Sequence, residues 1–250
     1  MVKYFAAVPA LYGLMSVNEY CTHRWYQHAE FNKEVWMQNI ACFILRKKEL
    51  KIRGGGHVEH HAETYDDMTL KKDTRWSRSP AAKSLDSDPY RGTAFTWQTT
   101  GLMTFQMLWS TIPVFKLLGF GLPGTFAFLL PGMLLHALIW NMLHPPMHGL
   151  PNVPLSVGAP SNWLAGLRNT PYFRYIYENH QGHHVLGGKC NYNVCCPGTD
   201  HLLGTYVPTA VWEPQMRPVP PFSAAERWGP AVEPIGVPQA PIDEKRAVVA

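Results

Sequence analysis

A long apolar run in the middle of the chain constrains its fold more than any other feature. From position 101 to 143 the sequence reads GLMTFQMLWSTIPVFKLLGFGLPGTFAFLLPGMLLHALIWNML, and its one formal charge is Lys116. The GFGLPG stretch at 119–124 divides this run, because closely spaced Gly and Pro favour a chain reversal. As helices, the two halves would be about 27 and 30 Å long, and a bilayer core is about 30 Å thick. The run therefore predicts a transmembrane helical hairpin, with a pair of buried core helices as the alternative.

Two shorter apolar segments precede the predicted hairpin. Segment 4–17 is short for a full span and has no clear cleavage site, so we expect a retained membrane helix or a re-entrant segment. Segment 35–45 is shorter still and amphipathic, which predicts a helix at the membrane interface. Lys and Arg gather at 46–53 and 71–78, a pattern that fits a juxtamembrane position. The formal net charge is only +4 and the other Lys and Arg residues are scattered, so the sequence does not indicate nucleic-acid binding.

The composition changes after Val207. Nine of the 22 prolines lie between positions 208 and 241, and a DEKR tetrapeptide follows. This pattern is typical of extended chain outside a core, so we expect one domain at 1–207 and a Pro-rich tail at 208–250. Such a tail is a candidate contact for a partner in a membrane complex. The five cysteines are odd in number and show no CxxC spacing, which favours reduced thiols over a disulfide scaffold.

Histidine is the second constraint, because ten of the twelve histidines form four short boxes at or beyond the ends of apolar segments. The boxes read HRWYQH, HVEHH, HPPMH and HQGHH. Their histidines are His23 and His28; His57, His60 and His61; His144 and His148; and His180, His183 and His184. His136 and His201 lie outside the boxes. The sequence thus predicts an all-α integral membrane protein with one or more helical hairpins in the bilayer and a polar face that carries the histidine boxes.

Spacing decides which imidazoles can meet. Residues three or four apart share one face of an α-helix, so each HxxHH box can direct at least two imidazoles to one place. His23 and His28 would be about 140° apart around an α-helix, so we expect them to flank a cluster or to serve different ions. Pro145 and Pro146 predict that His144 ends one helix and that His148 lies in the first turn of another.

Neutral imidazole is a ligand for iron, zinc and copper. Ten imidazoles in four boxes exceed the needs of one tetrahedral zinc, so we expect two transition metals close together, bound by the ten box histidines. His136, His201, Asn141 and Asp200 are additional candidates. Metal-bound imidazoles donate their second N–H to an outer group, and Asn141, Asp200 and Glu178 are candidates for that role. Trp25, Tyr26 and Trp140 are candidates for lining a lipid tunnel, with interfacial aromatics as the simpler interpretation.

The four ordered boxes resemble those of the membrane-bound fatty acid hydroxylase and sterol desaturase superfamily of di-iron enzymes. HRWYQH is similar to the HxxxxH box of that superfamily, HVEHH and HQGHH to its two HxxHH boxes, and HPPMHG to its HxxxHG box. NYNVCCPGTDHLLGTY at 191–206 is similar to the closing segment of the superfamily. The resemblance covers roughly positions 18–207.

The resemblance implies a cytosol-facing cap that carries the histidine boxes on a membrane hairpin base. It also implies two irons bound by the boxes and O2-dependent hydroxylation or desaturation of a membrane lipid, such as a fatty acyl, sphingolipid or sterol chain. Zinc can replace iron in a purified sample. A separate b-type cytochrome or reductase would supply electrons, since the sequence has no flavin or haem signature. The implied location is a multi-pass position in a membrane: the endoplasmic reticulum in a eukaryote, another organelle, or a bacterial inner membrane.

Two alternatives stay open. One is a non-catalytic structural subunit of a membrane complex that keeps the hydroxylase fold, an interpretation motivated by the Pro-rich tail and the prolines of HPPMH. The other is a carotenoid hydroxylase, whose boxes are similar but whose third box normally has four intervening residues where this chain has three between His144 and His148.

Overall fold

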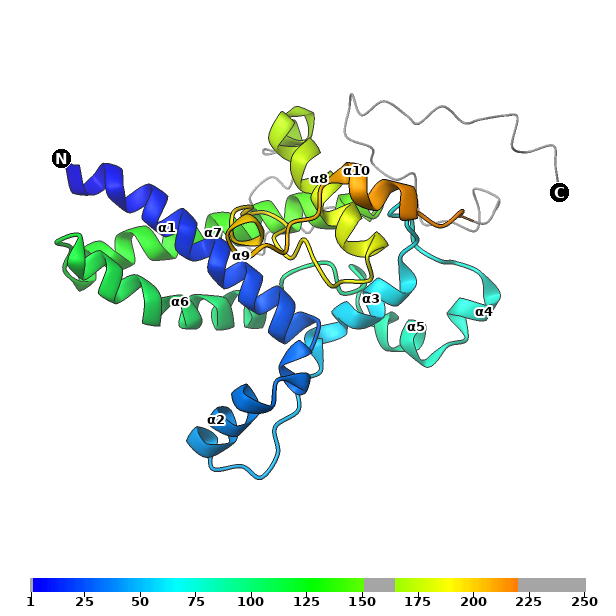
Figure 1. The fold of residues 1–250 in the computed structure, drawn as a ribbon, viewed down its shortest axis with the longest axis horizontal. Coiled ribbons are helices and arrows are strands. Elements are labelled where there is room, and N and C mark those ends of the chain that lie inside the picture. Colours follow the sequence, from blue (N-terminus) through cyan, green and yellow to red (C-terminus); the bar gives the residue numbers. More distant parts are fainter. Residues whose placement is uncertain (1, 151–164, 220–250) are drawn as a thin grey trace.

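The chain is built from helices and their connections (Figure 1). A computed structural model describes residues 2–150 and 165–219, and within these ranges it contains no β-strand, only an isolated bridge between Thr64 and Leu70. The longer helices are α1 (Val2–Cys21), α2 (Val35–Leu45), α3 (His57–Glu63), α6 (Trp97–Leu117), α7 (Leu122–Met147) and α8 (Pro171–Val185). Short helices are α4 (Thr74–Ser77), α5 (Pro80–Leu85), α9 (Thr199–Leu203) and α10 (Thr209–Trp212). Single turns are η1 (Thr22–Gln27), η2 (Glu30–Lys33), η3 (Gly54–Gly56), η4 (Ala165–Asn169) and η5 (Glu213–Gln215). The all-α class is confirmed for the described residues.

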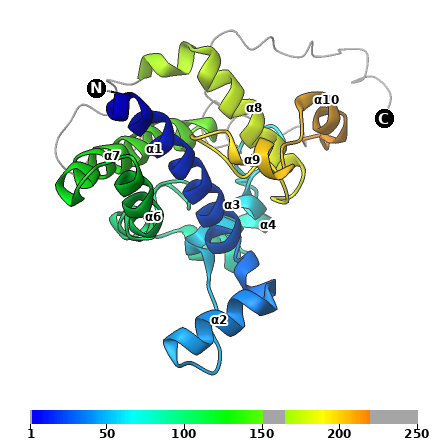
Figure 2. The same ribbon diagram turned by 60° about the vertical axis from the view of Figure 1, so that its left-hand side comes forward.

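Helices α1, α6 and α7 lie side by side and form a bundle, as both views show (Figures 1 and 2). The turn between α6 and α7 falls within the GFGLPG stretch, where Gly119 adopts a left-handed φ of 82°. Lys3 donates from Nζ to the Gly119 carbonyl, which brings the start of α1 to this turn. The core of the bundle is apolar and includes Leu11, Met107 and Leu129. The predicted hairpin of two antiparallel helices is therefore present.

The membrane prediction is met in part. In the ranges that the structure covers, α7 is the one helix both long and apolar enough to cross a membrane. The predicted interfacial segment is the short apolar helix α2. The N-terminal apolar segment is longer than predicted, because α1 continues through Asn18 and Glu19 to Cys21. These two polar side chains are buried and have partners, and Asn18 donates to the Met103 carbonyl of α6.

Charged pairs hold together the region beyond the carboxyl end of α1. Glu63, at the end of α3, is buried and accepts from Arg91 Nε at 2.6 and 2.8 Å and from Trp76 Nε1 at 2.8 Å. Asp66 is buried and accepts from the guanidinium and main-chain N–H of Arg217. These contacts join the end of α3 to α4 and to the loop at Arg91, and they join the following residues to the end of the described chain.

Packing continues beyond the predicted domain boundary at 207. The indole of Trp212, in α10, is buried against Gly182 of α8, and Arg217 is bonded to Asp66. The first part of the predicted tail thus lies against the protein's own domain. The remainder of that tail, 220–250, lies outside the described residues. All five cysteines are free, as the sequence predicted.

The close approach of α1 to α7 yields a test of the bundle. A Cβ at Gly132 would lie 2.8 Å from Leu11 Cδ2, whereas a Cβ at Gly101 of α6 would meet nothing within 4 Å. We predict that Gly132→Leu lowers the free energy of unfolding by about 1–3 kcal/mol, because overpacking separates the two helices. Thermal unfolding of the purified protein in detergent measures this, with Gly101→Leu as the matched control. Equal midpoints for the two variants would contradict this packing.

Candidate metal centre

A π-helix brings the two histidines of the first box together. In η1 the N–H of His28 donates to the carbonyl of His23, five residues earlier, at 3.0 Å. A π-helix has wider turns than an α-helix, so residues five apart lie on the same face. The Nε2 atoms of His23 and His28 are accordingly 3.2 Å apart. The expectation that these two side chains serve different ions, which assumed α-helical turns, is not met.

The third box also differs from its prediction, because α7 runs through Pro145 and Pro146 to Met147. Proline 146 cannot donate to the Met142 carbonyl four residues earlier, and the Arg168 guanidinium donates to that carbonyl instead, at 3.0 Å. His148 directly follows the helix and is its C-cap. The prediction of two separate helices at HPPMH is therefore wrong.

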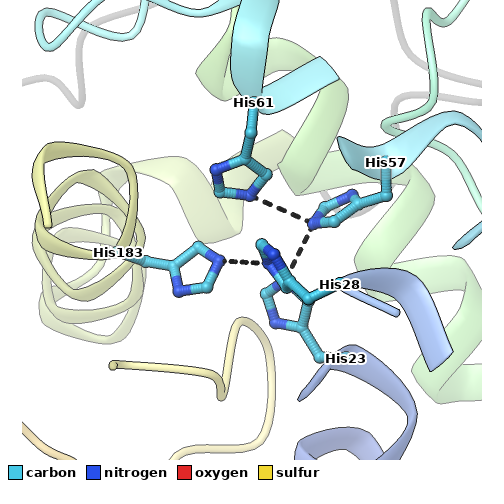
Figure 3. A group of neighbouring side chains, drawn as sticks. All are labelled: His23, His28, His57, His61 and His183. Carbon is cyan, nitrogen blue, oxygen red and sulfur yellow. Dashed lines mark hydrogen bonds between the residues drawn. The ribbon is translucent and has the colours of Figure 1, made fainter. Parts of the chain in front are cut away.

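The ten box histidines gather in two adjacent groups at the junction of α1, α3, α7 and α8. The first group is His23, His28, His57, His61 and His183. The second is His60, His144, His148 and His180. In each group the ligand atoms all lie within 4.8 Å of one another. The tenth histidine, His184, is 3.1 Å from His180 between Nε2 atoms, so it borders the second group. Figure 3 shows the five rings of the first group turned toward a common centre.

Both HxxHH boxes contribute to both groups. In α3, His57 and His61 belong to the first group and His60 to the second. In α8, His183 belongs to the first group, while His180 belongs to the second and His184 borders it. In both helices, the histidines four residues apart thus face one group and the histidine between them faces the other. The sequence predicted convergence of the boxes but not this division.

The separations between Nε2 atoms are near those of ligands on a shared metal ion: His60 to His148, at 3.2 Å, lies within that range, and the shortest pairs fall slightly below it. They are 2.8 Å for His23 to His57 and for His28 to His183. In the second group His144 and His180 are 2.7 Å apart. Ligand nitrogens about 2.1 Å from a metal lie roughly 3.0 Å apart at right angles and 3.4 Å apart at the tetrahedral angle.

Main-chain carbonyls fix the tautomer of four of these imidazoles. Nδ1–H of His23 donates to the Tyr192 carbonyl, and that of His183 donates to the Cys190 carbonyl. In the second group, His144 donates to Thr93 and His148 to Met68 in the same way. A carbonyl can only accept, so each Nδ1 carries the proton and each Nε2 presents a lone pair to its group.

Burial keeps the imidazoles neutral. The pKa of His148 is lowered to about 3, mainly by desolvation. Desolvation, followed by the proximity of other imidazoles, also lowers the pKa of His60, His61, His180 and His184 well below its ordinary value. Neutral imidazole is the form that binds metals. Two clusters of neutral, buried nitrogen donors with inward lone pairs can hold metal ions, so the residues present fit the metals that the boxes imply.

Glu19 is a supporting residue that sequence reasoning missed. It is buried near the carboxyl end of α1 and pairs with Nε2 of His136 at 2.5 Å. Its carboxylate also accepts main-chain N–H groups of Val194, Cys195 and Cys196 at 2.7–3.2 Å. Glu19, His136 and Cys196 are close enough to bind an ion, but this carboxylate already has hydrogen-bond donors. We interpret the trio as a structural link between α1, α7 and the closing segment.

The closing segment 191–206 carries the carbonyl that orients His23. Asp200 accepts the N–H groups of Tyr192 and Asn193 at 2.9 and 2.6 Å, and Glu19 holds the next residues of the segment. These bonds fix the Tyr192 carbonyl against the imidazole. Asp200 therefore acts on the histidine cluster through the backbone rather than by a direct bond to an imidazole.

The remaining candidates lie beside the centre or away from it. Asn141 bonds the N–H and carbonyl of Phe95, at 2.7 and 3.0 Å, and Glu178 accepts from Thr209. His201 lies apart from both groups and bonds the Tyr175 hydroxyl. Trp140 is fully buried, 4.8 Å from His144 between ring centroids, so an interfacial position is wrong for it. Trp25 packs edge-on against Tyr20, and Tyr26 is half-buried.

Comparison with known proteins found no matching family model, no matching curated protein and no matching solved structure.

The two groups predict the metal content of the protein. We expect the purified chain to hold about two transition-metal ions, one for each group of imidazoles. His57→Ala removes a ligand of the first group and His148→Ala one of the second, and each should weaken one site by about 10- to 100-fold or more. Metal analysis by mass spectrometry after dialysis against a weak chelator measures the loss. His201→Ala is the control, and its content should equal that of the wild type.

The lowered pKa values of the histidines predict acid sensitivity. In the unfolded chain these histidines bind protons below about pH 6.5, whereas in the folded chain they resist protonation. Protons therefore stabilise the unfolded state, and the free energy of unfolding falls as pH decreases below about 6.5. Thermal unfolding of metal-free protein between about pH 8 and about pH 5 should show a falling midpoint. A flat profile would contradict the buried, neutral state.

Proposed function

We propose that this protein is a di-iron, O2-dependent oxidoreductase that hydroxylates or desaturates a membrane lipid, and that it belongs to the superfamily its boxes resemble. One observation carries the proposal: histidines from four boxes far apart in the sequence form two adjacent, largely buried imidazole groups at one end of an apolar helical bundle. Many neutral nitrogen donors that face one another are best explained by a metal ion that they bind.

The donor set favours iron. The first group offers five imidazoles, one more than a tetrahedral zinc site accepts. Imidazole suits iron, and such sites accommodate more than four ligands. Two iron ions bound here would supply the redox chemistry by which O2 oxidises an unactivated C–H bond.

The outer surface of the bundle supports placement in a bilayer. Large apolar side chains there are exposed, including Phe5, Trp109, Leu117 and Leu134. So many large apolar side chains exposed on three packed helices are unusual in a soluble monomer. We infer that α7 crosses the membrane and that α1 and α6, of similar length, accompany it as further membrane segments. The histidine groups then lie at the cytosolic interface, of the endoplasmic reticulum in a eukaryote or of a comparable membrane elsewhere.

An apolar groove on the bundle suits a lipid chain. It has a volume of about 440 Å³ and lies between α6 and α7, lined by Trp97, Phe105 and Leu134 among others. Trp97 is two residues from Phe95, whose ring stacks on Trp140 at 4.1 Å, and Trp140 in turn contacts His144. The rings of Phe95 and Trp140 thus form a stack beside the second imidazole group. These rings keep water from the metal groups, which an oxidation of C–H bonds requires.

Each part of the chain then has a defined task. The imidazoles hold the metals, and the carbonyls of Tyr192, Cys190, Thr93 and Met68 orient four of the rings. Electrons come from a separate donor, a b-type cytochrome or a reductase. Exposed basic side chains outside segment 46–53, such as Arg75 and Arg78, offer positive charge to an acidic donor.

The main alternative is a structural subunit that keeps the fold without catalysis. The structure weakens its two motivations. HPPMH forms part of a continuous helix and places both of its histidines in one imidazole group. The first part of the tail packs on the protein itself. A carotenoid hydroxylase remains a lesser alternative. Assays with a carotenoid and with a membrane lipid as substrate distinguish it from the proposed lipid hydroxylase.

Activity on lipid tests the proposal. We expect the iron-loaded full chain in lipid nanodiscs, given a reductant and ¹⁸O-labelled O2, to form labelled hydroxy lipid or unsaturated lipid detectable by mass spectrometry. His60→Ala should lower product by about 100-fold or more, because it removes a ligand from the second group. His201→Ala is the matched control and should retain activity. A metal-free protein purified with a stoichiometric partner would refute the enzyme and favour the structural subunit.

A further inference from the structure

Helix α2 presents its apolar face away from the protein. Trp36, Ile40, Phe43 and Ile44 are spaced so that they share one side of the helix. Their exposed fractions are 61, 53, 85 and 69%. No residue of α2 is buried. In a soluble protein the apolar face of an amphipathic helix packs on the core, so this orientation requires an apolar environment outside the protein.

The position of α2 is fixed rather than loose. Both views show it extending from the body of the protein, apart from the α1, α6 and α7 bundle (Figures 1 and 2). The two ends of this excursion are joined by Asn32, which accepts the N–H of Ile52 at 2.9 Å and donates to its carbonyl at 2.7 Å. Gln38, in α2, donates to the Asn32 carbonyl at 2.8 Å. The apolar face is therefore held outward.

A basic segment follows α2 directly. Positions 46–53 read RKKELKIR, with five basic residues and one acidic residue. The basic side chains are Arg46, Lys47, Lys48, Lys51 and Arg53, and all are exposed. Glu49, the one acidic residue of the segment, forms an ion pair with Lys51 at 2.8 Å. The positive charge of the other four basic residues is not offset by Glu49. The exposed apolar face is thus adjacent to a concentrated positive charge.

We propose that α2 and the basic segment 46–53 bind the surface of an anionic phospholipid bilayer. An apolar face with Trp and Phe beside a cluster of Lys and Arg is the composition of helices that lie in the membrane interface. The apolar side chains enter the acyl boundary while the basic residues contact lipid phosphates. A protein partner would need an acidic rim around an apolar groove, whereas an anionic bilayer supplies both requirements along the full length of the helix.

The location in the chain gives this surface a role. The excursion leaves the fold after His28 and returns just before His57, both of which belong to the first imidazole group. Contact of α2 with the bilayer therefore fixes the distance of that group from the lipid phase. This surface does not depend on the chemistry at the metals, so its test is separate from the test of catalysis.

Depth-dependent fluorescence quenching tests the proposal on the full chain. In a Cys21→Ser, Cys42→Ser background, Phe43→Cys carries an environment-sensitive label, and the protein is reconstituted in vesicles of phosphatidylcholine with or without phosphatidylglycerol. We expect brominated acyl chains to quench the label, more strongly in the anionic vesicles. A label on Lys83→Cys, exposed in α5, is the control and should not be quenched.

Charge reversal separates the electrostatic contribution of the basic segment from the apolar contribution of α2. Arg46→Glu, Lys47→Glu and Lys48→Glu together should reduce quenching at position 43 by roughly two- to fivefold in anionic vesicles and leave metal content unchanged. Quenching by aqueous iodide instead of brominated lipid, in both kinds of vesicle, would overturn the proposal. Protection from both quenchers only in the presence of a copurified protein would also overturn it, in favour of a protein partner.

Discussion

Lone pairs of neutral imidazoles converge at the carboxyl ends of α1 and α7, and much of the remaining structure supports that convergence. Four Nε2 atoms have no proton to offer because their Nδ1 atoms donate to carbonyls. Several lone pairs directed at one place favour a cation there. The negative ends of the helix dipoles of α1 and α7 point to the same place and favour positive charge there. Both features favour the binding of a metal cation at this centre.

Support for this arrangement comes from buried polar contacts that are distant from the imidazoles in sequence. Glu19 and Asp200 together satisfy the N–H groups of five residues of the closing segment, Tyr192 to Cys196. An unpaired carboxylate in such a place would be costly, whereas a carboxylate with several donors is stabilised. The polar groups of the protein therefore fix backbone carbonyls, and the carbonyls orient the ligands.

Local sequence rules predicted the helical hairpin and the histidine boxes because both depend on residues close together in the chain. The π-helix at the first box was not predictable from local sequence. Its wider turn is needed only because His23 and His28 face the same imidazole group, which depends on residues far away in the chain. The helix through Pro145 and Pro146 required knowledge of Arg168, which replaces a lost donor from a distant position. Glu19 could have been found from the sequence. A buried acid at the end of an apolar helix needs a polar partner, and His136, the one histidine within the apolar run, is that partner.

The division of each HxxHH box between two groups links the two metal positions mechanically. All three histidines of α3 turn together when the helix rotates about its axis, so the position of His60 is coupled to those of His57 and His61. In α8, His180 and His183 are coupled in the same way. A first ion that fixes these rotations leaves less conformational freedom for the second ion to remove. The two helices would thereby set the spacing between two bound ions, and the filling of the two positions would be cooperative.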